Sequence, residues 1–379
     1  MCVTLMACRD PGPPPPSNAR VAEDAPALEA LRAADFASAE RLSAEQLVLS
    51  PCDSEAAAIH ALASYAQTAQ ALYIDSGMAS RPGAITALLD DAAKPAMVGF
   101  VDRLDAIDRD LQVASGDPQF SLELCVGCWQ VDWNRDGRID EREAQFLAEL
   151  GPDGHELPLS DPRARPTYRF DVGDVSWART SLALQRAAID LLLAYRWNEV
   201  VDRPADRDAV AHLVAPDRVA RARELLLAAT GLADQTREAY LAEPDDDHEW
   251  VPNPRQHDHP VPLAVDSALY DRWATVTADA RRLVAGEEGV PIRELAPFVF
   301  IAATSHAYID VGAMLEHPTD IVVPRNPASV EALLRSVLGN GYRDSMRPSP
   351  IVVDMGATAA QLESIAELKR KLRYLVWLN

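Results

Sequence analysis

Apolar residues recur at intervals of three and four along most of the chain, which is the spacing that gives a helix one buried face. The stretch 53–74 has this pattern and begins with Asp53, whose side chain suits a helix N-cap. The stretch 94–115 repeats it, with Pro95 in the first turn, where a missing backbone N–H does no harm. The predicted buried faces are Ile59, Leu62, Ala66, Ala69 and Tyr73 in the first helix, and Met97, Phe100, Val101, Leu104 and Ile107 in the second.

The second half of the chain continues the helical pattern with longer stretches. One helix is predicted over 174–197 with Asp174 as its N-cap, and another over 265–289 that ends at Gly286, a residue suited to a helix C-terminus. A last helix is predicted over 357–379. The apolar faces are Trp177, Leu184, Ala188, Leu191 and Tyr195 in the first, Leu269, Trp273, Val276, Ala280 and Leu283 in the second, and Leu362, Ile365, Leu368, Leu372 and Leu375 in the third.

Three other segments break this regularity. Residues 120–129 fit a strand as well as a helix, and residues 243–262, rich in acids and prolines, predict a long surface excursion. Residues 151–170 carry four prolines and two glycines and predict a linker or loop. We therefore predict a mainly α, multi-helix bundle-like protein with a Pro-rich start at 1–20, a helical region at 21–150, this linker, and a second helical region at 171–379.

The stretch "DWNRDGRIDERE", residues 132–143, places an oxygen-bearing side chain at every second position. Calcium requires six to eight oxygen ligands, and a short loop can supply them only if it is tightly wound, as Gly137 would allow. The predicted ligands are the side chains of Asp132, Asn134, Asp136, Asp140 and Glu143 and the backbone carbonyl of Arg138. Ile139 is expected to face the core, and residues 141–150 to continue as a helix with Phe146, Leu147 and Leu150 on its apolar side.

These residues resemble the loop of an EF-hand calcium-binding protein, with every expected position filled. The resemblance implies one bound calcium ion, and it covers about thirty residues with the flanking segments. The chain departs from the family in two ways. No second loop is found to pair with the first, and the segment before the loop carries Gly127, Cys128 and Val131 where the family often has helix-forming and aromatic residues. These departures favour a structural ion over a calcium sensor.

Charge and hydropathy narrow the class of partners. The chain of 379 residues carries a net charge of -22, which would repel nucleic acid, and no apolar run is long enough to cross a bilayer. The start, "VTLMAC" ending at Cys8, resembles the lipobox of bacterial lipoproteins, and the Pro-rich stretch after it resembles a tether. The resemblance implies lipidation of Cys8 and a place in the cell envelope, in the periplasm or at the outer membrane. Without a functional lipobox, the expected location is the cytoplasm.

Three weaker patterns could indicate a metal site or a catalytic site, and each also has a simpler explanation. Cys125 and Cys128 form a CxxC pair that predicts either a local disulfide or two buried thiols, since no further ligands for zinc are near. His257 and His259, with the acids at 245–247 upstream, predict a solvated acidic loop rather than a metal site. "SHAYID", with Ser305, His306 and Asp310, lacks the surroundings of a catalytic triad, and the histidine suits a packed core position.

The sequence therefore favours a non-catalytic, calcium-binding helical protein, exported and lipid-anchored, that serves as a structural or binding module of the cell envelope. The alternative is an enzyme of unknown class, with a structural calcium site and chemistry near residues 245–259. That alternative predicts a cleft with perturbed acids beside this loop. Calcium-dependent dimerisation through Ile139 is a third possibility. The sequence names no protein partner.

Overall fold

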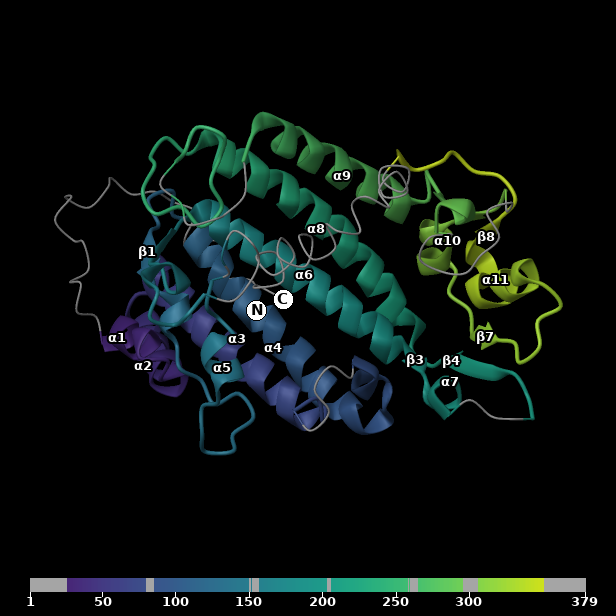
Figure 1. The fold of residues 1–379 in the computed structure, drawn as a ribbon, viewed down its shortest axis with the longest axis horizontal. Helices are drawn as coiled ribbons and strands as arrows, with labels where there is room; N and C mark the ends of the chain where they lie inside the picture. Colours follow the sequence, from purple (N-terminus) through teal and green to yellow (C-terminus); the bar gives the residue numbers. More distant parts are fainter. Residues whose placement is uncertain are drawn as a thin grey trace. The chain divides into compact units, whose positions relative to one another are not determined.

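The computed structural model describes residues 26–79, 85–149, 151, 157–202, 206–257, 259, 265–295 and 306–350 (Figure 1). These residues are mainly helical, with a few short strands, which confirms the predicted fold class. The chain divides into two compact units, one formed by residues 1–74, 102–179 and 235–266 and the other by residues 75–101, 180–234 and 267–379. No helix in the described part is long and apolar enough to span a membrane.

The first unit is built on long helices whose apolar stripes meet in one core. Its elements, or the parts of them that fall in this unit, are α1 (Pro26–Arg32), α2 (Phe36–Leu49), α3 (Ser54–Asp75), α4 (Lys94–Ser115), β1 (Leu122–Leu124), α5 (Glu141–Gln145), β2 (Tyr168–Phe170), α6 (Val172–Ala194) and α8 (Pro216–Ala242). α1 and α2 pack side by side (Figure 1). Asp53 caps α3, and both predicted helices are confirmed. The predicted face of α4 is buried throughout, whereas in α3 only Ile59 and Ala66 of the predicted face are buried and the rest is half-buried.

The second unit combines helices with two small antiparallel sheets. It contains the start of α4, the larger parts of α6 and α8, and the helices α7 (Asn198–Asp202), α9 (Ser267–Ala285), α10 (Val311–Glu316) and α11 (Val330–Leu338). One sheet is formed by β3 (Tyr195–Arg196), β4 (Ala209–Leu213) and β7 (Ile321–Val323), and the other by β5 (Val290–Pro291), β6 (Tyr308–Ile309) and β8 (Tyr342–Arg343). One apolar cluster joins Tyr195, Val219 and Val284, and another joins Ile292 to Tyr342. Neither sheet was predicted, because strands of two to five residues leave almost no periodic pattern.

Two predicted helices need correction. α6 begins at Val172, two residues before the predicted N-cap, because the side chain of Asp171 accepts the amides of Gly173 and Asp174. Its predicted apolar face is also wrong, since Leu184 and Ala188 are exposed. In α9 the predicted face is wrong, since Leu269 and Val276 are exposed and the buried residues are Tyr270, Thr277, Asp279 and Val284. The helix predicted over 357–379 lies outside the described residues.

The ambiguous stretch 120–129 is a strand followed by a single 3₁₀ turn, Val126–Cys128, rather than a helix. β1 pairs antiparallel with β2, with Leu122 opposite Phe170, and this pairing joins the C-terminal end of the predicted linker segment 151–170 to the first unit. The helix predicted over 141–150 is limited to α5, and Phe146 beyond it is exposed. The loop at 132–143 is therefore not flanked by two long helices.

Candidate functional site

Gly137 sets the shape of the loop at 132–143. Its φ is +87°, in the left-handed region that glycine enters without steric cost. A Cβ built there would meet nothing within 4 Å, so the backbone conformation and not a lack of space requires glycine. This agrees with the role assigned to Gly137 from the sequence.

The loop is wound around the side chains of its own predicted ligands. Asp132 accepts two backbone amides, Oδ1 from Asp136 at 3.1 Å and Oδ2 from Gly137 at 2.7 Å. Asn134 Oδ1 accepts the amide of Asp136 at 2.8 Å, and Asp136 Oδ1 accepts the amide of Arg138 at 2.9 Å. A carboxylate or amide oxygen has two lone pairs, so each of these atoms can still bind a cation while it holds the loop.

Glu143 closes the loop at its other end. Its Oε1 accepts the amide of Asn134 at 3.2 Å, and its Oε2 accepts the amide of Asp140 at 3.1 Å. Asp140 returns a bond, since its Oδ1 accepts the amide of Glu143 at 2.9 Å, and the pair forms a capping box that starts α5. The last predicted ligand therefore already lies across the loop from the third position.

The start of the loop is fixed to α3. Gln70 donates through Nε2 to the carbonyl of Asp132 at 2.7 Å, and its Oε1 accepts a guanidinium hydrogen of Arg135 at 3.0 Å. The ring of Trp133 meets the ring of Phe146 edge-on, with centroids 5.4 Å apart. These contacts join both ends of the loop to the fold.

The prediction that Ile139 faces the core is wrong, because its side chain is 43% exposed. In an EF-hand this position is covered by a second loop or by a pair of helices. Here the segment before the loop is a strand and a 3₁₀ turn, and α5 after it has only five residues. The described fold therefore offers Ile139 no helix pair to pack against.

The acidic side chains of the loop are spread apart. In the described part of the chain, ligand atoms of three His, Cys, Asp or Glu residues come within 4.8 Å of one another only at Glu243, Asp245 and Glu249. In the loop, the same types of atom are turned toward backbone amides. Binding of a calcium ion would therefore require the carboxylates to turn toward a common point, by small side-chain rotations within a loop that is already wound.

A second cluster of acids lies where α6 begins and α8 ends. Asp174 is almost fully buried, and its Oδ1 accepts the hydroxyl hydrogen of Tyr240 at 2.8 Å. Its Oδ2 accepts the backbone amide of Asp171 at 2.9 Å. Burial raises the pKa of Asp174 well above its usual value, and the neighbouring charge of Asp171 raises it further.

Glu243 and Glu249 belong to the same cluster. Burial is the largest cause that raises the pKa of Glu243 to about 9, followed by its side-chain hydrogen bond to Asp171. Burial likewise raises the pKa of Glu249 to about 7. A hydrogen bond between two carboxyl groups needs a proton on one of them, so this cluster holds at least one neutral carboxyl group around neutral pH.

Asn253 and Gln256 bind the segment after α8 to this cluster. Asn253 Nδ2 donates to the carbonyl of Tyr240 at 2.8 Å, and Gln256 Oε1 accepts the amide of Asn253 at 2.6 Å. The predicted surface excursion is thus exposed at Asp245, Asp246 and Asp247 but anchored by buried side chains on either side. Asp171, Tyr240, Glu243 and Glu249 could not be recognised from the sequence, because Asp171 is distant along the chain and the other three form no known motif.

The structure places the weaker candidates from the sequence as follows. His257 is exposed and its backbone amide donates to Asp246, while Asp258 between the two histidines lies outside the described residues. His306 is exposed, so the core position expected for it is wrong, and Asp310 caps α10 and pairs with Arg343 at 3.0 Å. Ser305 and the predicted lipidation site Cys8 also lie outside the described residues.

The CxxC pair is a disulfide. Cys125 and Cys128 are joined across a Cα–Cα distance of 5.3 Å, which settles the choice between a disulfide and two thiols and excludes zinc at these sulfurs in the oxidised chain.

A scan against protein-family models and searches of curated proteins and of solved structures returned no match to this chain.

Proposed function

We propose that the chain is a non-catalytic, calcium-binding helical protein whose loop at 132–143 holds one ion as a structural clamp. The supporting observation is that Asp132, Asn134 and Asp136 already organise the turn at Gly137 while Glu143 lies across the loop. Asp132, Asn134, Asp136, Asp140, Glu143 and the carbonyl of Arg138 would hold the ion. Bound calcium would draw these carboxylates toward a common point, neutralise their charge and fix the segment between Gln70 and α5.

The proposed place of action is the cell envelope, with a lipid anchor on Cys8. The disulfide between Cys125 and Cys128 supports an oxidising compartment, because disulfides persist outside the cytosol. Calcium outside the cytosol is abundant enough to fill a site with a dissociation constant of roughly 0.1 to 1 mM. The anchor is tested by partition of the expressed protein between water and a detergent phase. We expect the parent protein to enter the detergent phase and Cys8→Ser to stay in water. Equal partition of both forms would contradict the anchor.

The calcium clamp is tested by thermal unfolding of the purified protein with calcium, with magnesium and with a chelator. We expect calcium to raise the unfolding temperature, because an ion that binds only the folded chain stabilises it by mass action. Magnesium should have a much smaller effect, since it is smaller and keeps its water ligands. Identical unfolding temperatures with calcium and chelator would contradict the proposal.

The alternative proposal, an enzyme with its site near residues 245–259, is supported by one observation. The carboxyl oxygens of Glu243, Asp245 and Glu249 lie within 4.8 Å of one another, and the pKa of Glu249, about 7, suits acid–base chemistry. Structural roles also account for this cluster, since it joins α6, α8 and the segment after α8 through Tyr240 and Asn253. We therefore prefer the calcium clamp.

A further inference from the structure

The Cys125–Cys128 disulfide lies on a tight turn, and its two cysteine residues differ in exposure. The turn Val126–Cys128 is closed by backbone hydrogen bonds from Cys128 to Cys125 and from Trp129 to Val126, both 3.0 Å. Cys128 is exposed, whereas Cys125 is half-buried between the buried residues Leu124 and Val126. A dissolved thiol can therefore reach the sulfur of Cys128 more readily than that of Cys125.

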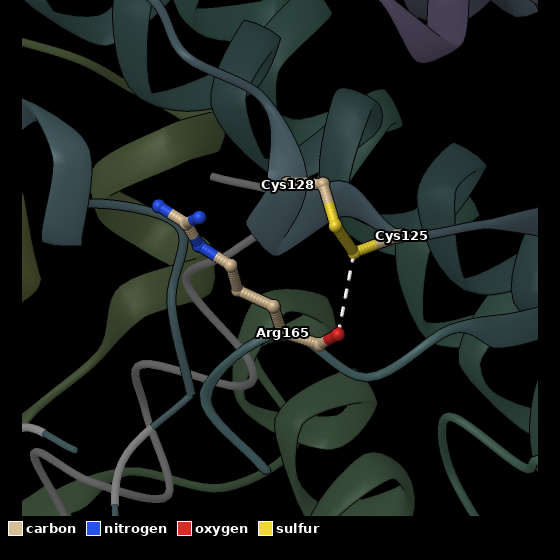
Figure 2. Close-up of a disulfide and its surroundings, with 3 residues drawn as sticks. All are labelled: Cys125, Cys128 and Arg165. Carbon is tan, nitrogen blue, oxygen red and sulfur yellow. Dashed lines mark hydrogen bonds between the residues drawn. A yellow bond between two sulfur atoms is a disulfide. The ribbon is translucent and has the colours of Figure 1, made fainter. Parts of the chain in front are cut away.

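The sulfur of Cys125 has a polar neighbour that Figure 2 shows in close-up. It lies 3.3 Å from the carbonyl oxygen of Arg165. A disulfide sulfur carries no proton, so the oxidised form has a close S···O contact there and no hydrogen bond. When the disulfide is reduced, the Cys125 thiol can donate its hydrogen to this carbonyl without any movement of the backbone. The fold thus provides a stabilised place for a protonated Cys125.

The turn does not depend on the sulfur–sulfur bond for its shape. Its backbone hydrogen bonds remain after reduction, and the buried side chains of Val126 and Trp129 hold it from both sides. Gly127 is packed against backbone, since a Cβ there would lie 3.1 Å from the carbonyl oxygens of Leu147 and Ala164. The two thiols would therefore stay adjacent after reduction and could form the bond again.

We propose that this disulfide is a thiol–disulfide exchange site that reacts with small-molecule thiols, with Cys128 as the sulfur attacked and Cys125 as the leaving sulfur. A thiolate attacks Cys128 Sγ, the bond to Cys125 breaks, and Cys125 leaves as a thiolate that takes up a proton from water. The resulting Cys125 thiol keeps this proton and donates a hydrogen bond to the Arg165 carbonyl. A second thiolate then attacks the mixed disulfide at the small-molecule sulfur and releases Cys128. Two small thiols are oxidised to one disulfide, and the protein disulfide is reduced to two thiols.

The test uses the full chain in its native state, with reduced glutathione as the probe. After incubation, free thiols are blocked with a limiting amount of N-ethylmaleimide, and tryptic peptides are fragmented in a mass spectrometer to show which cysteine carries the label. Cleavage after Arg109 and Arg135 gives a peptide, residues 110–135, that holds Cys125 and Cys128 and neither Cys2, Cys8 nor Cys52. We expect reduction under native conditions and labelling of Cys128 at least about ten-fold faster than Cys125.

Two results would overturn the proposal. One is a disulfide that glutathione reduces only after the chain is denatured, which would identify it as a purely structural bond. The other is equal or faster labelling of Cys125. The variants Cys125→Ser and Cys128→Ser provide a second measurement, with glutathione disulfide as the probe. Cys125→Ser should form a mixed disulfide quickly and Cys128→Ser slowly. The reverse order would contradict the assignment of the two sulfurs.

Discussion

Glu143 Oε1 lies 3.2 Å from the backbone nitrogen of Asn134 and accepts its hydrogen, so the last acid of the loop reaches back to the third position. The same carboxylate accepts the amide of Asp140 through Oε2. Glu143 thus connects the two halves of the loop. If the loop binds calcium as proposed, Glu143 would also bind the ion with both carboxylate oxygens.

Replacement of Glu143 by Gln should weaken calcium binding by roughly ten-fold or more, because one ligand oxygen and the negative charge are lost. Glutamine keeps an oxygen that can accept an amide hydrogen, so α5 should still form. Glu141→Gln is the matched control, since Glu141 is exposed in the same helical turn and is not a predicted ligand. Isothermal titration calorimetry of the three proteins makes the comparison. Equal affinities for Glu143→Gln and Glu141→Gln would show that Glu143 is not a ligand.

Replacement of Gly137 by Ala should destabilise the loop by about 1 kcal/mol, because φ is +87° there and a side chain is strained in that region. Calcium affinity should fall with it. Gly99→Ala in α4 is a control of opposite sign: its Cβ would meet nothing within 4 Å, and alanine in a helix interior should stabilise by about 0.5 to 1 kcal/mol. Urea unfolding of both variants measures the difference, and a neutral Gly137→Ala would mean that the loop is not held in this conformation.

Stability should fall as the pH rises from about 5 to 9. The pKa of Glu243 is raised to about 9 and that of Glu249 to about 7, so across this range the folded chain keeps protons that the unfolded chain has released. Each carboxyl group therefore favours the folded state less as the pH approaches its own raised pKa. Glu243→Gln should flatten this dependence. Glu238→Gln should leave it unchanged, because Glu238 is an exposed acid on α8, the helix that ends just before Glu243. The measurement is the unfolding temperature of the parent and of both variants between pH 5 and pH 9. Parallel curves for the parent and Glu243→Gln would contradict the raised pKa of Glu243.

Loss of the Tyr240 hydroxyl should destabilise the first unit. The hydroxyl donates to Asp174 Oδ1 at 2.8 Å, and both residues are buried, so Tyr240→Phe leaves a buried carboxyl oxygen without this donor. We expect a loss of about 1 to 3 kcal/mol in the free energy of unfolding. Denaturant unfolding measures it, and an unchanged midpoint would show that the bond contributes little to the fold.

The helices could be predicted from the sequence where one apolar face was clear. The stripe from Met97 to Ile107 is buried as predicted, because no other face of α4 competes with it. In α9 the apolar pattern selected Leu269 and Val276, yet the buried face includes Asp279, which forms an ion pair with Arg282. A pattern of apolar residues cannot indicate a polar side chain that is buried with its partner.

The two candidate sites also differ in how far they could be predicted from the sequence. The loop at 132–143 is contiguous, so the spacing of Asp132, Asn134 and Asp136 and the need for Gly137 were legible in the sequence. The carboxyl cluster joins Asp171 to Glu243 and Glu249 through folding alone, and its members carry no shared motif. Sequence analysis pointed to the acids at 245–247 but missed the buried residues that bind that segment to the helices.

A calorimetric titration of calcium into the purified, oxidised protein tests the central claim most directly. The account predicts one equivalent of calcium per chain, with a dissociation constant of roughly 1 mM or tighter and much weaker heats with magnesium. The absence of any calcium-specific heat, in a protein whose folding is verified by its unfolding transition, would contradict the assignment of residues 132–143 as a calcium site.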